Sequence, residues 1–222
     1  MIPQKLPRKI RYLYINIMSK EMREQIDRLR NLSINEDFNG NETDIEILYK
    51  NHPELSKIGT TEQYSNYIRS IFPSSGVKNI VYHDTRSENI DGGKLRPSNI
   101  GAYGEGIYVQ TRRELTGVFG PKTLFLVINT KKAFPYHSLG IEQTNPYWKK
   151  ISEKHRATKK QDWVENAKVE FKEYIIDLGF DALKTNEGNG DVYYILFEPE
   201  QTHILGTRED MEAFNKFLGS KH

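Results

Sequence analysis

The fold is decided between residues 79 and 129, which contain NIVYH (79–83), GIYV (106–109) and TLFLVIN (123–129). Each run is short, rich in β-branched or aromatic residues, and bordered by Gly, Pro or Asn, which is the pattern of β-strands. VYYILF (192–197) predicts a further strand near the C-terminus. Because the strands follow one another without regular strand–helix alternation, we expect an α+β fold.

Helical patterns lie on both sides of these strands. Apolar stripes at helical spacing predict helices over residues 19–32, 61–72, 161–178 and 208–218. Thr60 followed by Gln63 reads as a capping box at the start of the second helix, and Pro73 ends it. We therefore expect an N-terminal helical extension over 1–72 and a main domain over 73–222.

Composition excludes several classes of protein. The 222 residues include 32 Lys and Arg against 30 Asp and Glu, and the net charge of +2 argues against a histone-like polycation. The absence of Cys excludes disulfides, thiolate metal sites and a Cys nucleophile. The six His have no metal-ligand spacing, so we expect no metal. No apolar run fits a signal peptide or a membrane span, so we expect a cytoplasmic protein without a membrane partner.

Common enzyme motifs are missing from the sequence. There is no P-loop, no GxSxG and no HExxH. GAYGEG (101–106) precedes a strand instead of a helix, so it cannot place a pyrophosphate on a helix N-terminus.

Three motifs remain, in the order YHDT (82–85), YGEGIYVQTRRELTGVFG (103–120) and YYILFEPEQTHILG (193–206). Taken singly, each has an ordinary structural explanation. Together they resemble the PARP-like ADP-ribosyltransferase fold, with a His on one strand, a Tyr in a GxGIYF-type strand and a Glu before a final strand ending in Gln. The lead-in over 54–83 is similar to that of ADP-ribosyltransferase-like domains in phage and bacterial polypeptides, so the resemblance covers about residues 53–220.

The resemblance implies two packed, mainly antiparallel sheets with an NAD cleft between them. It implies that His83 bonds the adenosine ribose and the nicotinamide amide region, and that Tyr108 stacks on the nicotinamide ring. Thr116 falls where a hydroxyl bonds the carboxamide, and Phe119 where a second aromatic ring closes the stack. Asp84 and Thr85 complete the expected NAD-binding set. An aromatic face attracts the cationic nicotinamide by about 0.5–2 kcal/mol.

The sequence departs from the family pattern at two positions. Asp84 stands where the family usually has Gly, and Tyr193 stands at the position of the catalytic Glu. Tyr193 can form a hydrogen bond to a ribose hydroxyl but carries no charge near pH 7, so we expect transfer of single ADP-ribose units. Asp191 lies about 7 Å earlier on the same strand face and is our candidate for the missing charge; it is equally compatible with merely ending the turn. Glu187 is a further candidate.

The segment KKISEKHRATKK (149–160) holds six cations against one acid, flanked by Tyr147, Trp148 and Trp163. Cations that neutralise phosphates beside aromatics that stack bases suit a nucleic-acid groove. A solvated loop is an equal alternative. The candidate acceptor-binding residues are Lys149, Lys150, Lys154, Arg156, Lys159 and Lys160. Residues 1–30 carry a net charge of +5 and could extend this surface or bind an acidic antitoxin.

We therefore expect a mono-ADP-ribosyltransferase that uses NAD and modifies RNA, DNA or protein. The resemblance further implies an intracellular toxin of a bacterial or phage conflict system. The main alternative is a catalytically inactive module of the same fold that binds NAD, ADP-ribose or a partner, and Asp84 and Tyr193 are its main support. A third alternative is a structural nucleic-acid-binding protein.

Overall fold

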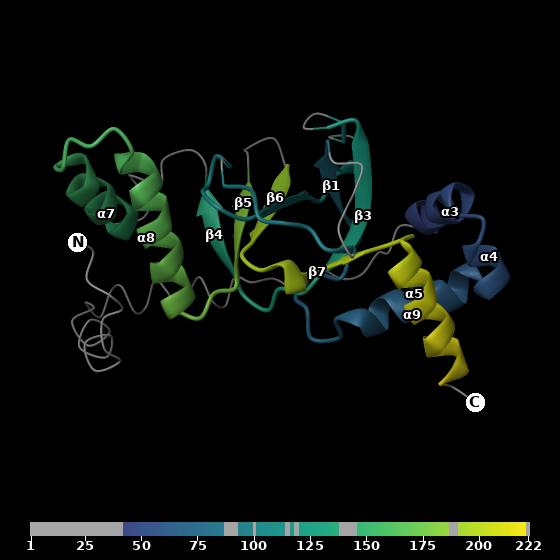
Figure 1. The fold of residues 1–222 in the computed structure, drawn as a ribbon. Coiled ribbons are helices and arrows are strands. Elements are labelled where there is room, and N and C mark those ends of the chain that lie inside the picture. Colours follow the sequence, from purple (N-terminus) through teal and green to yellow (C-terminus); the bar gives the residue numbers. More distant parts are fainter. Residues whose placement is uncertain are drawn as a thin grey trace. The chain divides into compact units, whose positions relative to one another are not determined.

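Figure 1 shows the fold in a computed structural model of the chain. The structure describes residues 42–86, 93–99, 101–113, 116–117, 120–137, 146–186 and 191–220. The predicted helix over 19–32, the basic first thirty residues, Phe119 and Glu187 lie outside the described residues.

The described elements are six α-helices, seven strands and a short 3-10 helix. The helices are α3 (Glu42–Asn51), α4 (Leu55–Ile58), α5 (Thr61–Ile71), α7 (Pro146–Arg156), α8 (Trp163–Asp177) and α9 (Arg208–Gly219). The strands are β1 (Val81–Thr85), β2 (Ile107–Gln110), β3 (Lys122–Ile128), β4 (Ala133–His137), β5 (Ala182–Asn186), β6 (Val192–Leu196) and β7 (Thr202–Ile204), and the 3-10 helix is Pro199–Gln201.

Local signals explain where these elements begin and end. Thr60 accepts a bond from the Gln63 amide at 3.2 Å while the Gln63 side chain accepts one from the Thr60 amide at 2.8 Å, so the predicted capping box starts α5. Gly179 follows α8 with φ 83°, a conformation that favours Gly. The four predicted strands and the three predicted helices within the described residues are present, with ends shifted by at most two residues.

The strands form one sheet in the order β4-β5-β6-β2-β1-β3-β7, in which only β4 and β5 run parallel. β1 pairs with β3 along its whole length, from Val81 to Thr85. By contrast, β1 meets β2 at a single residue pair, Tyr82 with Gln110. The α+β class is therefore confirmed, whereas the expected pair of packed sheets is wrong, because the described strands form a single sheet. This sheet narrows at the β1–β2 junction between the halves β4-β5-β6-β2 and β1-β3-β7.

One core lies on one side of the sheet and is built from side chains of both halves. Val81 and Leu126 from one half join Val109 and Leu196 from the other, together with Leu95. Burying these side chains removes apolar surface that favours the folded state by about 25 cal/mol per Å². This shared core holds the two halves together where the β1–β2 pairing is thin.

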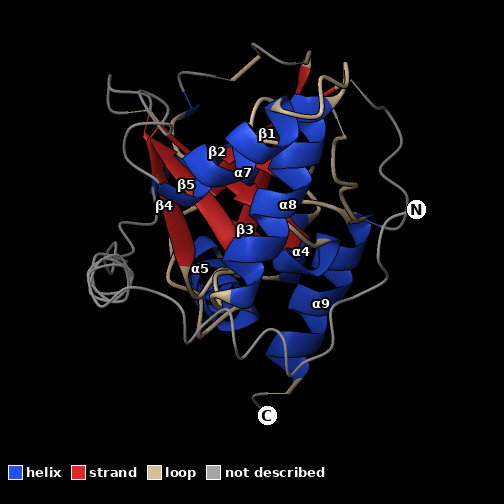
Figure 2. Cartoon of the chain, turned by 90° about the vertical axis from the view of Figure 1, so that its left-hand side faces the viewer, coloured by secondary structure: helices blue, strands red, loops and turns tan. Residues whose placement is uncertain are grey.

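Helices cover the opposite side of each half. Tyr64 and Phe214, from α5 and α9, share a second core with Tyr82 and Val127 of β1 and β3. At the other end, α7 and α8 lie beside each other in front of the sheet (Figure 2), and Phe171 of α8 packs on β4.

The helices before residue 72 belong to the main body. All described residues fall within one compact unit, Asn35–His222. Since Tyr64 and Tyr67 share a core with Tyr82, Pro73 does not divide two compact units. None of the helices in the described ranges has the length and apolarity needed to cross a bilayer.

Candidate functional site

His83 lies at the β1–β2 junction, one residue beyond the Tyr82–Gln110 pair. Its Nδ1 is 2.7 Å from the carbonyl oxygen of Tyr108. A carbonyl only accepts, so Nδ1 carries the hydrogen and Nε2 is left as an acceptor when the ring is neutral. Burial lowers the pKa of His83 and outweighs the bond to Tyr108 and the nearby Asp84, both of which raise it. The junction therefore holds a neutral imidazole whose Nε2 has no partner among the described residues.

Tyr108 is held by the glycine-rich loop that precedes β2. Its hydroxyl donates to the Gly104 carbonyl at 2.6 Å and accepts from the Tyr103 amide at 2.9 Å. A methyl group on Gly101 would come within 1.9 Å of the Tyr108 hydroxyl oxygen, so this position requires glycine. Burial raises the pKa of Tyr108 to about 12. The glycines of GAYGEG thus form a cradle for a tyrosine hydroxyl.

His83 and Tyr108 lie on neighbouring strands, but their side chains point to opposite sides of the sheet. Ile107 and Val109 point into the shared core, so Tyr108 between them points to the other side, toward α8. His83 lies on the same side of β1 as Val81, which is in the shared core. The structure therefore joins the two residues through the main chain of β2.

The end of β1 carries the other residues that we expected around NAD. Asp84 accepts a bond from the Thr123 hydroxyl at 2.9 Å. Gly120 lies so close to Thr85 that a β-carbon would come within 2.5 Å of the Thr85 carbonyl group. Thr116 is half-buried in the turn just before, where its amide donates to the Arg113 carbonyl. Gly120 thus lies at the end of β1, beside Thr85 and two residues along the strand from His83.

Asp191 and Tyr193 lie on the edge of the site that β6 forms. Tyr193 pairs with Gln110 across the β2–β6 ladder. Asp191 is buried, and its carboxylate is 2.8 Å from Nη1 of Arg112. The side chain of Arg112 is 47% exposed and that of Asp191 is 6% exposed. The carboxylate that we expected to supply negative charge is therefore already balanced by a guanidinium.

Gln110 is the site residue that sequence reasoning missed. It lies between Tyr82 and Tyr193, it is 3% exposed, and both its amide nitrogen and its amide oxygen lack a partner within the described residues. Asn79 and Asn129 leave only their Oδ1 atoms unpaired. A buried polar group without a partner costs about 1–3 kcal/mol, so Gln110 needs an explanation. The available signal was a Gln directly after the predicted strand GIYV (106–109).

The segment 149–160 forms most of α7 and the turn that follows it. Its flanking aromatics pack within the protein: Tyr147 stacks on Tyr174 with ring centroids 4.1 Å apart, and Trp148 meets Phe171 edge-on. Arg156 lies over the Trp163 ring at 5.0 Å. The expected role of these rings in base stacking is therefore not supported by their contacts.

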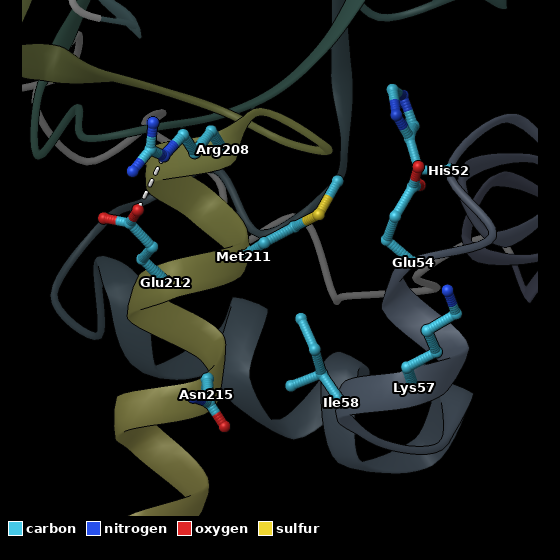
Figure 3. Close-up of a pocket in the computed structure, with 8 residues that line it drawn as sticks. All are labelled: His52, Glu54, Lys57, Ile58, Arg208, Met211, Glu212 and Asn215. Atoms are coloured by element: carbon cyan, nitrogen blue, oxygen red, sulfur yellow. Dashed lines mark hydrogen bonds and ion pairs between the residues drawn. The ribbon is translucent and has the colours of Figure 1, made fainter.

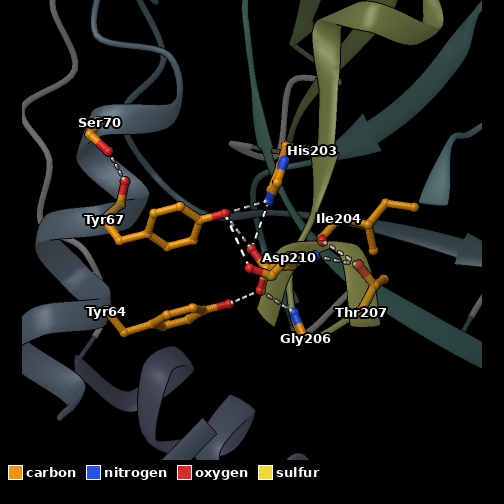
Figure 4. A network of polar contacts seen from close by, with 8 residues as sticks. All are labelled: Tyr64, Tyr67, Ser70, His203, Ile204, Gly206, Thr207 and Asp210. Atoms are coloured by element: carbon orange, nitrogen blue, oxygen red, sulfur yellow. Dashed lines mark hydrogen bonds and ion pairs between the residues drawn. The ribbon is translucent and has the colours of Figure 1, made fainter. Parts of the chain in front are cut away.

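A second polar cluster surrounds Asp210 (Figure 4). The buried carboxylate accepts bonds from the hydroxyls of Tyr64 and Tyr67, from His203 Nε2 at 2.7 Å and from the Gly206 amide at 2.9 Å. These partners come from α5, β7 and the turn before α9, and Asp210 itself lies in the first turn of α9. The cluster ties three elements together and leaves the carboxylate with no open position.

A pocket of about 540 Å³ lies between α4 and α9 (Figure 3). Charges of both signs line it, and Arg208 and Glu212 are paired at 2.8 Å. The lining residues are His52, Glu54, Lys57, Ile58, Arg208, Met211, Glu212 and Asn215. None of them is a residue that the sequence predicted for the site. Among the described side chains, no group of three or more His, Asp or Glu is arranged to hold a metal ion.

Comparison with known proteins adds little to this geometry. No protein-family model matches the chain, and no curated protein matches it. A crystal structure of an anti-CRISPR protein is similar with a TM-score of 0.33 and 10% identity, over 57% of this chain and 94% of that chain. At that score the likeness indicates neither family nor activity.

Proposed function

We propose that the β1–β2 junction binds NAD and that the protein transfers a single ADP-ribosyl group to a macromolecular acceptor. The observation that carries the proposal is the neutral His83, fixed by the Tyr108 carbonyl at the point where the two halves of the sheet meet through one residue pair. Its Nε2 can accept a hydrogen bond from a ribose hydroxyl. The resemblance of the three motifs to ADP-ribosyltransferases supplies the identity of the ligand.

The proposed reaction requires little acid–base chemistry. The bond between nicotinamide and ribose C1″ breaks, and its electron pair leaves with nicotinamide, which departs as a neutral pyridine. A nucleophile of the acceptor bonds to C1″ and gives its proton to water. The protein has to orient the ribose and stabilise an oxocarbenium-like sugar, as in glycosidases.

The β6 edge supports slow, single transfer. Tyr193 supplies a hydroxyl where a carboxylate would stabilise the positive sugar, and the charge of Asp191 is balanced by Arg112. Gln110 adds an unpaired amide next to Tyr193. Hydrogen bonds, in place of full charges, are thus what this edge can offer the reacting sugar.

The Arg112–Asp191 ion pair also favours a second candidate, a module that binds NAD or ADP-ribose without turnover. A carboxylate held by a guanidinium stabilises a developing cation less than a free one does. This candidate keeps the same ligand and the same His83 contact, so the two functions differ in turnover alone.

Labelled NAD separates the candidates. NAD affinity and nicotinamide release are measured for the wild type, for His83→Ala and for the control His155→Ala, whose imidazole bonds Glu170 on α8. We expect wild type and control to bind NAD and release nicotinamide above the buffer rate, and His83→Ala to lose about tenfold in affinity or more. Binding without release would favour the module, and no binding by the wild type would overturn the junction as an NAD site.

The toxin role is tested in cells. If the proposed activity arrests growth, expression of the wild-type chain should stop bacterial division, whereas His83→Ala at equal protein level should not. Equal growth arrest by both chains would show that toxicity does not depend on His83 at the junction. An antitoxin partner is a further part of this proposal.

A further inference from the structure

The outer side of α7 and the turn after it carry an unusual number of exposed cations. We define the α7 basic surface by its six members: Lys149, Lys150, Lys154, Arg156, Lys159 and Lys160. On α7, Lys149, Lys150, Lys154 and Arg156 are exposed, whereas Ile151 and Ser152 are buried. Against these six, the segment holds one acid, Glu153.

Two of the six cations already have partners. Lys154 pairs with Glu170 at 2.7 Å, and Arg156 lies over the Trp163 ring. No acidic partner is found among the described residues for the remaining four, Lys149, Lys150, Lys159 and Lys160. Like charges this close repel one another and destabilise the fold unless an external anion is present.

Lys159 adds an observation from the backbone. It is the one non-glycine residue with positive φ in the described ranges, at 54°. A side chain in this left-handed region is disfavoured relative to glycine, and residues held there cluster at functional sites. Lys159 is exposed, and its side chain has no hydrogen bond or ion pair within the part of the chain that the structure describes. The conformation therefore presents a lysine side chain where glycine would suit the turn better.

The chemistry of the surface favours phosphates over a protein partner. Protein interfaces are depleted in lysine and are centred on aromatic or apolar anchors. The exposed residues here are lysines, Arg156, Glu153, Ala157 and Thr158, and the nearby aromatic rings are engaged with α8 or Arg156. A nucleic acid instead offers closely spaced phosphates that such cations neutralise.

We propose that the α7 basic surface binds the sugar–phosphate backbone of a nucleic acid without reading its bases. Because the aromatics are engaged, contact is through charge instead of base stacking, which suits a double helix as well as a single strand. The binding itself does not depend on NAD; that the bound nucleic acid is also the acceptor rests on the proposed function.

The test uses fluorescence anisotropy of the full chain with a random-sequence DNA duplex, a single DNA strand and an RNA strand, over a series of salt concentrations. The triple variant Lys149→Gln, Lys150→Gln, Lys160→Gln is compared with Lys131→Gln, Lys132→Gln, Lys216→Gln, which removes the same charge from exposed lysines elsewhere. We expect the first variant to lose about tenfold in affinity or more, with the salt slope reduced by about 1 per lysine. The control should bind within about twofold of wild type.

Three outcomes would overturn the proposal. Equal losses in both triple variants would show that overall charge and not this surface is responsible. Strong dependence on base sequence, measured with several duplexes of fixed and different sequence, would contradict backbone recognition. Binding of an acidic polyglutamate peptide, but of none of the nucleic acids, would assign the surface to a protein partner. Nicotinamide release is measured without nucleic acid, so failure of the NAD proposal leaves this binding result unaffected.

Lys159→Gly isolates the residue with positive φ. We expect its melting temperature to be equal to or above that of wild type and its affinity for the duplex to fall. If both the melting temperature and the affinity were unchanged, Lys159 would not be part of the binding surface.

Discussion

Two buried polar residues in this protein have opposite surroundings. Asp210 is fully buried, and its carboxylate receives bonds from two tyrosines, one histidine and a backbone amide. Gln110 is 3% exposed, and neither end of its amide has a partner among the described residues. The two side chains are almost equally buried, so burial alone does not explain the difference.

The difference separates a structural cluster from a candidate site. Folded proteins pair nearly all of their buried polar groups, because an unpaired group keeps the full cost of leaving water. The Asp210 cluster follows that rule and joins α5, β7 and α9. Gln110 breaks the rule beside Tyr193, where the two halves of the sheet meet, on the side to which Tyr108 points and opposite the side of His83. An unpaired amide at that place is what a ligand with hydroxyl or amide groups would satisfy.

The largest expected effect comes from breaking the satisfied cluster. Asp210→Ala leaves the Tyr64 and Tyr67 hydroxyls and the Gly206 amide without their acceptor, so we expect a loss of about 3–5 kcal/mol in the free energy of unfolding. Urea denaturation measures it. Asp162→Ala is the matched control, because Asp162 is exposed and makes no capping bond, and it should change stability by less than about 0.5 kcal/mol. Similar stabilities for the two variants would contradict the structural role of the cluster.

At the junction we expect a substitution to have the opposite effect on the free energy of unfolding. Gln110→Leu replaces an unpaired amide with an apolar group of similar size, so the free energy of unfolding should stay equal or rise by about 1–3 kcal/mol. NAD affinity should fall by about tenfold if the amide bonds the ligand. Urea denaturation and calorimetry with NAD test the two halves of this prediction.

Gln201 is the matched control for Gln110. Its amide oxygen accepts from Phe197 and Glu198, and its amide nitrogen donates to Asn129 and Asp181. Gln201→Leu leaves these backbone groups unpaired and should cost about 2 kcal/mol or more without a direct effect on NAD. If Gln110→Leu destabilised the protein as much as Gln201→Leu, Gln110 would have a structural role and the contrast with Asp210 would disappear.

How far the sequence predicts these regions depends on how local each signal is. The Thr60–Gln63 capping box and the apolar stripe of α8 are contained in a few residues, so α5 and α8 could be predicted. β4 contains a Pro, β7 has three residues, and β5 reads ALKTN; each becomes a strand only because a partner strand lies beside it. α3 begins within NEDFNGNETD, which reads as a loop, because Asp44 and Ile45 are buried against the sheet layer.

The same limit applies to the site. His83 and Tyr108 could be singled out as polar or aromatic residues on predicted strands. The side of the sheet on which each of these side chains lies could not be predicted, because the Tyr82–Gln110 pairing joins residues far apart in the chain. The partners of Asp210 and of Asp191 are long-range contacts for the same reason. The chemistry of a residue is visible in the sequence, whereas its pairing is set by the fold.

The smallest expected effect is a pH dependence at the junction. Burial lowers the pKa of His83 below the 6.5 of an unperturbed histidine, so the unfolded chain binds a proton at a higher pH than the folded one. The contribution of His83 to stability is therefore complete above pH 6.5 and is lost as the pH falls through 6.5 toward the lowered pKa. NAD affinity should follow the folded-state titration, because a protonated Nε2 can no longer accept a ribose hydroxyl. In His83→Gln both dependences should flatten, while in the control His155→Ala they should persist. The protonation of His83 is followed by NMR in the same pH series as the NAD affinity. A wild type that keeps its NAD affinity while the His83 ring becomes protonated would contradict an acceptor role for His83 and leave Gln110 as the sole candidate contact at the junction.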